Sequence, residues 1–249
     1  NNIAFVAWCW KAGGSASSNS DGTITSSVSA STTAGFSIVS WNGNDGTIGH
    51  GLGVKPAMII IKSRQTSNNW VVFHKGLGTM SASSDSILIL NGDAAKDDPG
   101  AGFSEPTTSV FTIKGGAASN DNNIGYVFAE KQGYSKFGSY TGNNNANGQF
   151  IYTGFKPAYV MTKMTDGAKN WMIYDNKRFP SNPINAYLTL SANTNAAEAY
   201  STVYPIDFLS NGFKFNTDTS EVNGTENHIY MAFAESPFVT SGGVPTTAR

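Results

Sequence analysis

The sequence predicts an all-β protein built from tandem, pseudo-symmetric antiparallel β-sandwich units, and three observations lead to this prediction. Of the 249 residues only 13% are charged, whereas 12% are aromatic and 27 are glycine, a composition closer to sandwiches and barrels than to helical proteins. Short runs rich in Val, Ile, Phe, Tyr and Trp alternate with clusters of Gly, Asn, Asp and Pro, which is typical of antiparallel strands and turns. The runs also recur after roughly one hundred residues, which indicates an internal duplication.

The duplication is clearest around two Lys-Pro dipeptides. Lys55-Pro56 and Lys156-Pro157 lie 101 residues apart, and each precedes an apolar run. Proline fixes φ and lacks a backbone donor, so the start of a strand is a position where a sheet tolerates it. Trp70 and Trp171 follow at the same separation. Shared positions of this kind indicate a common fold in the two copies.

The duplication sets the expected boundaries. Residues 35–133 form the first unit, 134–239 the second, and 240–249 a C-terminal tail. Whether the units are two sandwiches or the halves of one double-layered sandwich stays open, but the connection at 130–135 is too short for a flexible linker, so the units must pack tightly. The expected strands are 36–42, 57–63, 69–74, 86–90, 109–114, 124–131, 136–141, 150–153, 158–164, 170–175, 186–190, 212–216 and 228–235.

The first 34 residues are expected to lie outside both units. Residues 1–13 are predicted to be the last strand of an upstream repeat, because the stretch after Trp10 resembles the junction at 130–133. Residues 14–34 are rich in Ser, Thr, Ala and Gly and are expected to be a linker. Cys9, the single cysteine, excludes an intrachain disulfide, and its apolar surroundings predict a buried side chain.

Charge and spacing argue against several classes of partner. Formal net charge is −1, from 16 Lys+Arg and 17 Asp+Glu without a run of like charge, so neither nucleic acid nor an anionic membrane is an expected partner. No stretch has the length and apolarity of a membrane span. The three histidines lie far apart without metal-ligand spacing, so no metal or cofactor is predicted.

The sequence contains no catalytic signature. Serine is abundant, but there is no Gly-x-Ser-x-Gly elbow. Glu130 and Glu235 occupy matching repeat positions, and glycoside hydrolysis requires a pair of carboxylates. Equivalent residues of tandem copies need not face one another, so both are expected to be strand-end residues, and the protein is predicted not to be an enzyme.

Three tryptophans are candidates for carbohydrate binding, because aromatic faces stack on sugar rings. Trp70 and Trp171 recur inside apolar strands, which favours the core, whereas Trp41 lies beside a polar tip and fits either role. The tips are predicted to be hairpin turns, because Gly, Asn and Asp accept positive φ. The glycan-binding candidates are Trp41, Asn42, Asn44, Asp45, Asn143, Asn144 and Asn145.

Four segments carry a family resemblance that extends over nearly the whole chain: FVAWCWKAGG (5–14), TAGFSIV (33–39), GHGLGVKPAMIIIK (49–62) and YMAFAESPF (230–238). The sequence resembles a family of repeats at the C-terminal end of tail or fibre proteins of tailed bacteriophages, especially marine ones. The resemblance implies lectin- or jelly-roll-like sandwiches and a virion structural protein exposed on the particle surface. It supplies no catalytic residues.

The same resemblance implies the partners. These are other virion proteins and a glycan or protein receptor on the host surface, and the expected assembly is a homo-trimer, by analogy with fibres. Two alternatives stay open. One is an architectural capsid or tail component that binds only virion proteins, and the other is a carboxylate-dependent polysaccharide depolymerase.

Overall fold

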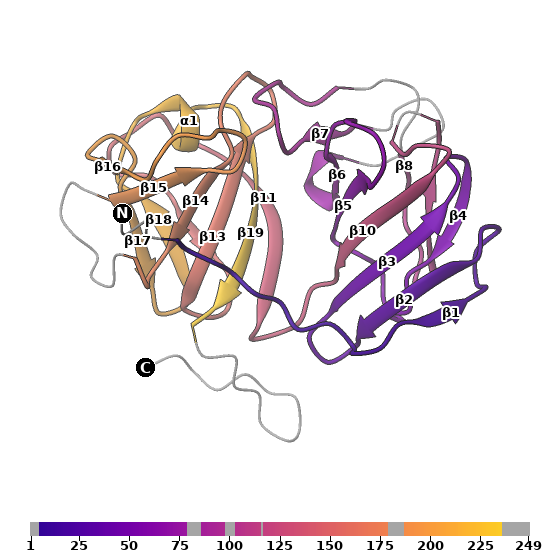
Figure 1. Cartoon of the computed structure of the whole chain (residues 1–249). Coiled ribbons are helices and arrows are strands. Elements are labelled where there is room, and N and C mark those ends of the chain that lie inside the picture. The colour runs from indigo at the N-terminus through magenta and orange to yellow at the C-terminus, as the bar shows by residue number, and fades with distance from the viewer. Residues whose placement is uncertain (1–4, 79–85, 98–102, 116, 179–186, 236–249) are drawn as a thin grey trace.

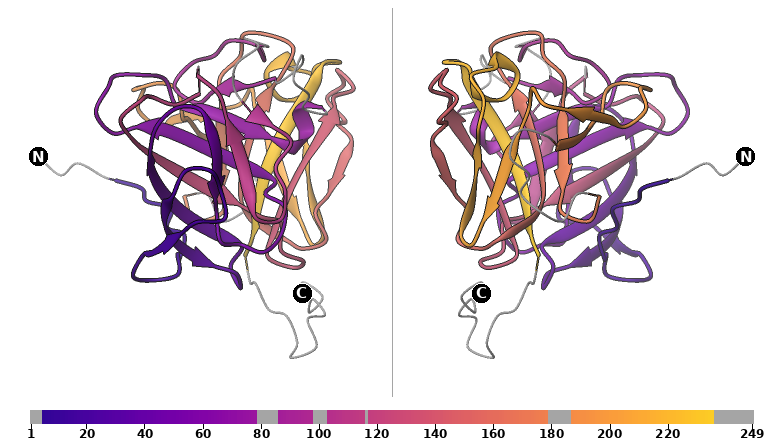
Figure 2. Two further views of the ribbon diagram at one scale, coloured as in Figure 1. Left: turned by 90° about the vertical axis from the view of Figure 1, so that its right-hand side faces the viewer. Right: turned by 90° about the vertical axis from the view of Figure 1, so that its left-hand side faces the viewer.

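The computed structural model describes residues 5–78, 86–97, 103–115, 117–178 and 187–235. These residues are almost entirely strand, joined by loops and by two short helical turns, η1 (Lys75–Leu77) and α1 (Ser220–Asn223). Figure 1 shows two β-rich units side by side, and in the end-on views of Figure 2 the units overlie one another. The all-β class predicted from composition is confirmed.

The first unit is a sandwich of a seven-stranded and a three-stranded antiparallel sheet. Its large sheet has the order β1-β2-β3-β10-β5-β6-β7 and its small sheet the order β4-β9-β8. The bounds in the large sheet are β1 (Ser17–Asn19), β2 (Ser26–Ser31), β3 (Phe36–Asn42), β10 (Asn122–Phe128), β5 (Met58–Ser63), β6 (Val71–His74) and β7 (Leu88–Ile89). Those in the small sheet are β4 (Gly46–Gly49), β9 (Val110–Ile113) and β8 (Phe103–Ser104).

The second unit repeats this plan. Its large sheet has the order β11-β19-β13-β14-β15-β16 and its small sheet the order β12-β18-β17. The bounds in the large sheet are β11 (Ser135–Thr141), β19 (Asn227–Ala234), β13 (Pro157–Met164), β14 (Met172–Asp175), β15 (Tyr187–Ser191) and β16 (Ala199–Ser201). Those in the small sheet are β12 (Phe150–Tyr152), β18 (Gly212–Phe215) and β17 (Ile206–Leu209). The predicted tandem sandwiches are therefore present as two sandwiches packed against each other.

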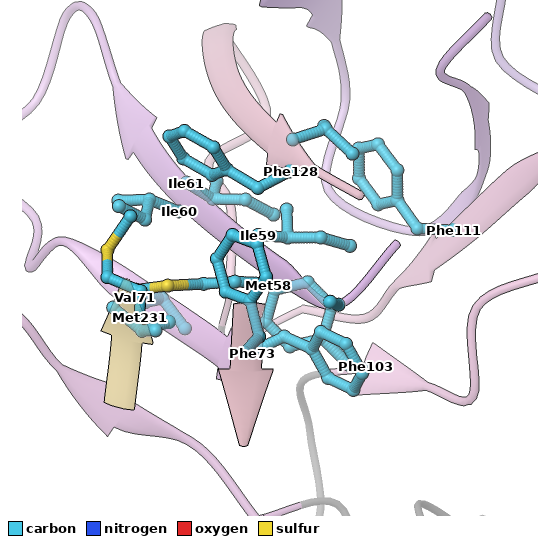
Figure 3. Close-up of a cluster of buried hydrophobic side chains, with 14 of the residues drawn as sticks. Met58, Ile59, Ile60, Ile61, Val71, Phe73, Phe103, Phe111, Phe128 and Met231 are labelled. Atoms are coloured by element: carbon cyan, nitrogen blue, oxygen red, sulfur yellow. The ribbon is translucent and has the colours of Figure 1, made fainter. Parts of the chain in front are cut away.

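Strand alternation gives each large sheet two apolar faces. Successive side chains point to opposite faces of a strand. In β5, Met58 and Ile60 share cavity walls with Met231 of the second unit. Ile59 and Ile61 are fully buried and, by alternation, point to the opposite face, toward the small sheet of their own unit. Figure 3 shows Met58 and Met231 together at the contact between the two units, called the seam below. The molecule thus has four layers: small sheet, large sheet, large sheet, small sheet.

Polar contacts also cross the seam. His74 Nε2 lies 3.1 Å from the carbonyl oxygen of Tyr230, and Trp171 Nε1 donates to the carbonyl of Ile89 at 2.9 Å. Glu130 at the end of the first unit pairs with both Lys75 and Lys136. Trp171 is buried, as predicted, whereas Trp70 is half-buried and stacks on Tyr126.

The N-terminal segment is not the predicted strand of an upstream repeat. Residues 5–13 form no strand in the part of the chain described here, and in Figure 1 they run across the seam. The Trp8 ring packs edge-on against Tyr159 in the second unit, and Trp10 packs against both Phe128 and Phe233. Cys9 is exposed, so its predicted burial is wrong: alternation turns it outward between two inward-facing tryptophans.

The predicted linker at 14–34 is also wrong, because it contains β1 and β2, which extend the large sheet beyond β3. Serine has little strand preference of its own, but pairing with β3 supplies a backbone ladder. Ser26 Oγ donates to the carbonyl of Gly49 at 2.9 Å, which ties β2 to the end of β4. Strands β4, β8, β16 and β17 were not predicted either, and the predicted residues 236–239 and tail 240–249 lie outside the described part.

We expect the two units to unfold together, because Phe233 packs against Phe128 and Phe137 within the seam. Phe233→Ala should lower the free energy of unfolding by about 3–5 kcal/mol, with coincident urea transitions by tryptophan fluorescence and far-UV circular dichroism. Val203→Ala, at a side chain 49% exposed, should change it by less than about 0.5 kcal/mol. Two separate transitions in the wild-type protein would contradict this expectation.

Stability should also fall in mild acid because of His74. Burial is the main reason that the pKa of His74 falls from 6.5 to about 3, so between these values the unfolded chain binds a proton that the folded chain does not. Its contribution is therefore complete above pH 6.5 and is lost as the pH falls, by about 1.4 kcal/mol per pH unit. Urea midpoints measured from pH 7.5 to 4.5 should decline less steeply in His74→Gln, and equal slopes would refute the assignment.

Candidate functional site

Two large aromatic side chains lie exposed on the outer face of the second unit's small sheet. Phe150 and Tyr152 are 45% and 63% exposed, and their rings meet edge-on with centroids 6.5 Å apart. We call the face made by Phe150, Tyr152, Gly212, Lys214 and Asp207 the aromatic platform. Exposed aromatic pairs on one face are uncommon in monomeric proteins and often mark binding sites.

The platform follows from the alternation of β12. Ile151 points into the sandwich and is buried, so Phe150 and Tyr152 point outward. Gly212 on the neighbouring strand leaves room for Phe150, because a Cβ atom at Gly212 would lie 2.6 Å from the phenyl ring and 2.2 Å from the carbonyl oxygen of Ile151. Glycine at this position therefore allows the aromatic ring to approach β18 closely.

Polar groups surround the two rings. The register of the three strands places Phe150, Lys214 and Asp207 in one row across the face, and Tyr152, Gly212 and Leu209 in the next. The Lys214 ammonium donates to Asn147 Oδ1, and Asp207 accepts from Asn216 at 2.7 Å. An ammonium, a carboxylate and an amide therefore lie beside the aromatic surface, and these groups can hydrogen-bond hydroxyls.

The equivalent face of the first unit has no such aromatic pair. Thr47 and Gly49 of β4 flank buried Ile48, as Phe150 and Tyr152 flank buried Ile151. A segment of the β1–β2 connection also covers the edge of β4: Ile24 N donates to the carbonyl of Thr47, and Ile24 and Ile48 form a parallel bridge. The junction between the units is too short to supply such a segment to β12, so the platform is open where its counterpart is covered.

An asparagine-rich loop, residues 142–149, leads into the platform from β11. It is held by Asn223 of α1, which is 1% exposed. Its amide donates to Asn143 Oδ1, to the carbonyl of Asn145 and to that of Thr217. Because this amide is fully engaged in the interior, the Asn-Gly-Thr acceptor pattern at 223–225 is inaccessible to a glycosylating enzyme in the folded protein.

Two of the three glycan-binding candidates on this loop, Asn143 and Asn145, form side-chain hydrogen bonds within the loop. Asn143 Nδ2 donates to the carbonyl of Asn147, and its Oδ1 accepts from the backbone of Asn145. Asn145 Oδ1 in turn accepts from the backbone of Asn147 at 2.8 Å. Asn144 is exposed, with a left-handed φ of 49°. It is therefore the loop candidate whose side chain is turned to solvent.

The glycan-binding candidates of the first unit differ in how far they are exposed. Trp41 is 4% exposed, packs edge-on against Phe111 and donates to the carbonyl of Gly43. It cannot stack on a sugar, so its surface role is corrected to a core role; it shares a strand face with buried Val39. Asn42 and Asp45 are exposed and Asn44 is half-buried.

The loops that carry these asparagines are not hairpins. Residues 43–45 and 142–149 each cross from the large sheet to the small sheet of a unit, because β3 does not pair with β4 and β11 does not pair with β12. The Gly and Asn residues there lie in connections between two sheets, and not in turns between two paired strands. The two loops belong to different units, and nothing in the described residues joins them into one site.

The titratable candidates are engaged elsewhere. Glu130 pairs with Lys75 and Lys136, and Glu235 pairs with Lys156 at 2.7 Å and accepts from Asn176. These ion pairs favour a structural role. All three histidines are buried, and burial lowers the pKa of each. Within the described ranges, no group of three His, Cys, Asp or Glu side chains is placed to hold a metal, and no helix has the length and apolarity to cross a membrane.

Fold and site together define a class: an all-β protein of two packed sandwiches with an aromatic platform on one outer sheet. The chain belongs to the family described as Domain of unknown function (DUF7483), whose model matches residues 1–237. That match spans both units, so the pair of sandwiches is one family unit. No curated protein and no solved structure matches the chain.

Sequence reasoning missed the platform, although a signal was present. In Phe150-Ile151-Tyr152 alternation must expose either the isoleucine or both aromatic residues. The alignment of the repeats resolves the choice, because Ile151 matches Ile48, the only residue of the Thr47-Ile48-Gly49 triplet with a large apolar side chain to bury. The aromatic residues therefore had to face outward.

We expect Asn223→Ala to loosen the loop beside the platform, because it removes the donor to the carbonyl of Asn145 and to the buried carbonyl of Thr217. The free energy of unfolding should drop by about 1–3 kcal/mol, and amide hydrogen exchange at 143–147 should quicken. Asn144→Gly is the matched control: glycine accepts the same positive φ, so stability and exchange should stay close to wild type. Equal exchange in all three proteins would show that Asn223 does not hold the loop.

Proposed function

We propose that the protein is a non-enzymatic, glycan-binding structural module, located at the end of a bacteriophage tail fibre. The observation that carries the glycan-binding part is the exposed pair Phe150 and Tyr152 beside Lys214 and Asp207. The tail-fibre setting rests on the sequence resemblance at 5–14, 33–39, 49–62 and 230–238. Other virion proteins, and further copies of the chain in a trimer, are the partners that this setting implies.

The chemistry of the platform suits a sugar. One face of a pyranose ring presents C–H groups, which pack on the negative face of an aromatic ring, while its hydroxyls point sideways to polar neighbours. Phe150 and Tyr152 offer the ring faces, and the ammonium of Lys214 and the carboxylate of Asp207 offer a donor and an acceptor in the same strand rows. A shallow, open face of this kind binds a chain of sugars from outside.

A second candidate is the architectural role, and the edge of β12 favours it. Strand β12 pairs with β18 on one side only among the described strands, and an open edge with exposed aromatic residues can accept a strand from another virion protein. The two functions use the same residues but differ in ligand. Binding to purified polysaccharide separates them.

The glycan proposal predicts that Phe150→Ala and Tyr152→Ala each weaken binding at least roughly tenfold, which corresponds to about 1.4 kcal/mol. The measurement is an array of bacterial surface glycans, followed by calorimetry with any polysaccharide that binds the 249-residue chain. Tyr200→Ala removes an equally exposed aromatic ring (64%) from β16, at the edge of the large sheet, and should bind normally.

Three outcomes are informative. Loss of binding in both platform variants but not in Tyr200→Ala supports the proposal. Equal binding in all variants places the glycan site elsewhere. If no glycan binds and the platform variants instead fail to associate with virion proteins in an adsorption or assembly assay, the architectural role replaces glycan binding.

A further inference from the structure

An apolar cavity of about 400 Å³ lies in the seam between the two sandwiches. Strands β3, β5 and β10 of the first unit form one wall, and β13, β14 and β19 of the second unit form the other. Trp8 and Trp10 of the N-terminal segment complete the lining. The walls are contributed chiefly by Ile38, Ile60, Phe128, Tyr159, Met161 and Met231.

The size of this cavity indicates a ligand. Voids in well-packed protein interiors are rarely larger than a water molecule, whereas pockets for small ligands measure about 300–1,000 Å³ and are mostly apolar. An apolar hollow gives water few hydrogen-bond partners. At about 30 Å³ for each water-sized group, the volume holds an alkyl chain of roughly a dozen carbons.

A groove of about 940 Å³ with hydroxyl groups and two cations in its lining adjoins the cavity, and Ile38 lines both. The N-terminal segment forms its border, where Ser29 Oγ donates to the carbonyl of Gly14 at 2.7 Å. Hydroxyl groups, most of them from the outer part of the large sheet, contribute to its lining beside the apolar side chains of Ala12, Ala30 and Ile124. The hydroxyl residues in its lining are Ser27, Ser29, Ser31, Thr32, Thr33 and Ser40.

The charges at the groove have one sign. Lys11 and Arg64 line it and are both exposed, and no carboxylate lines either the groove or the cavity. Within the described part of the chain, neither cation takes part in an ion pair. Hydroxyls and two unpaired cations are complementary to an anionic head group.

We propose that the cavity and groove together bind a single-chain anionic amphiphile. The alkyl tail lies between the two large sheets against Trp8 and Trp10, and the carboxylate, phosphate or sulfate head lies in the groove near Lys11 and Arg64. This site shares no residue with the aromatic platform, so the proposal stands whether or not the platform binds glycans.

The test uses sodium dodecanoate with the full chain, at concentrations below micelle formation. Wild-type protein should bind it saturably by calorimetry, and a bromine-substituted chain of similar length should quench tryptophan fluorescence. Trp8→Phe and Trp10→Phe should each reduce that quenching, because these rings line the cavity. Acetate represents the head group alone and dodecyltrimethylammonium reverses the charge; both should bind at least roughly tenfold more weakly than dodecanoate.

Two kinds of variant locate the ligand. Ala192→Trp fills the cavity from an exposed lining position and should abolish dodecanoate binding while circular dichroism and thermal unfolding stay normal. Lys11→Gln combined with Arg64→Gln should weaken dodecanoate roughly tenfold. Lys55→Gln, which removes an exposed cation that pairs with Glu105, should have no effect.

The proposal is overturned if wild-type protein does not bind dodecanoate saturably, or if Ala192→Trp and the double variant bind as wild type does. It is also overturned if light scattering shows that Ala192→Trp breaks an oligomer that dodecanoate does not affect, because a second copy of the chain would then be the occupant. Equal affinity for dodecanoate and dodecyltrimethylammonium would remove the head-group assignment and reduce the site to one for apolar chains.

Discussion

Burial of both faces of the central strands of both large sheets is the constraint on which the rest of this structure depends. An antiparallel sheet usually has one apolar and one solvated face, so its strands alternate. In β5 four consecutive side chains, Met58 to Ile61, are buried instead, because one set packs on the small sheet and the other on the second unit. Separated from its partner, either sandwich would expose the apolar residues of the seam. One family model spanning both units agrees with this requirement.

The same constraint decides where the two copies can differ. The central strands of the large sheets are enclosed, so substitutions there disturb packing on one side or the other. The outer faces of the small sheets, their edges and the loops that cross between sheets are free of that restriction. The first unit covers the edge of β4 with residues from the β1–β2 connection, and the second leaves β12 open with two aromatic rings. The platform is therefore one of the places where the two copies differ.

The sequence predicts a strand or a buried side chain correctly where neighbouring residues decide it, and fails where contacts with distant residues decide it. Strand β3 has the predicted bounds, because Phe36–Asn42 combines strand-forming residues with a clear turn on either side. Strands β1 and β2 could not be predicted from their serine-rich sequence, since their stability comes from pairing with β3. The exposure of Cys9 likewise depends on the packing of Trp8 and Trp10 at the seam, which forms only when both sandwiches are folded.

The candidate site shows the same division. Burial of Trp41 could have been inferred, because alternation places it on the face of Val39, yet its polar neighbours left the core and the surface equally open. The roles of Asn143 and Asn145 could not have been inferred, since the side chain that holds them, Asn223, is about 80 residues away. Loop asparagines look alike in sequence whether they bind a ligand or stabilise their own loop, and long-range hydrogen bonds decide between the two.

Tyr230 shows how the seam and the platform are connected through one strand. Its carbonyl oxygen accepts the seam contact from His74, while its ring packs edge-on against Phe213, with centroids 5.3 Å apart. Phe213 belongs to β18, lies between the platform residues Gly212 and Lys214 in sequence, and is paired with Ile151 of β12. Tyr230 is therefore one of the residues that connect the core beneath the platform to the seam. Packing at the seam is thus connected, through β19, to the interior of the small sheet that carries Phe150.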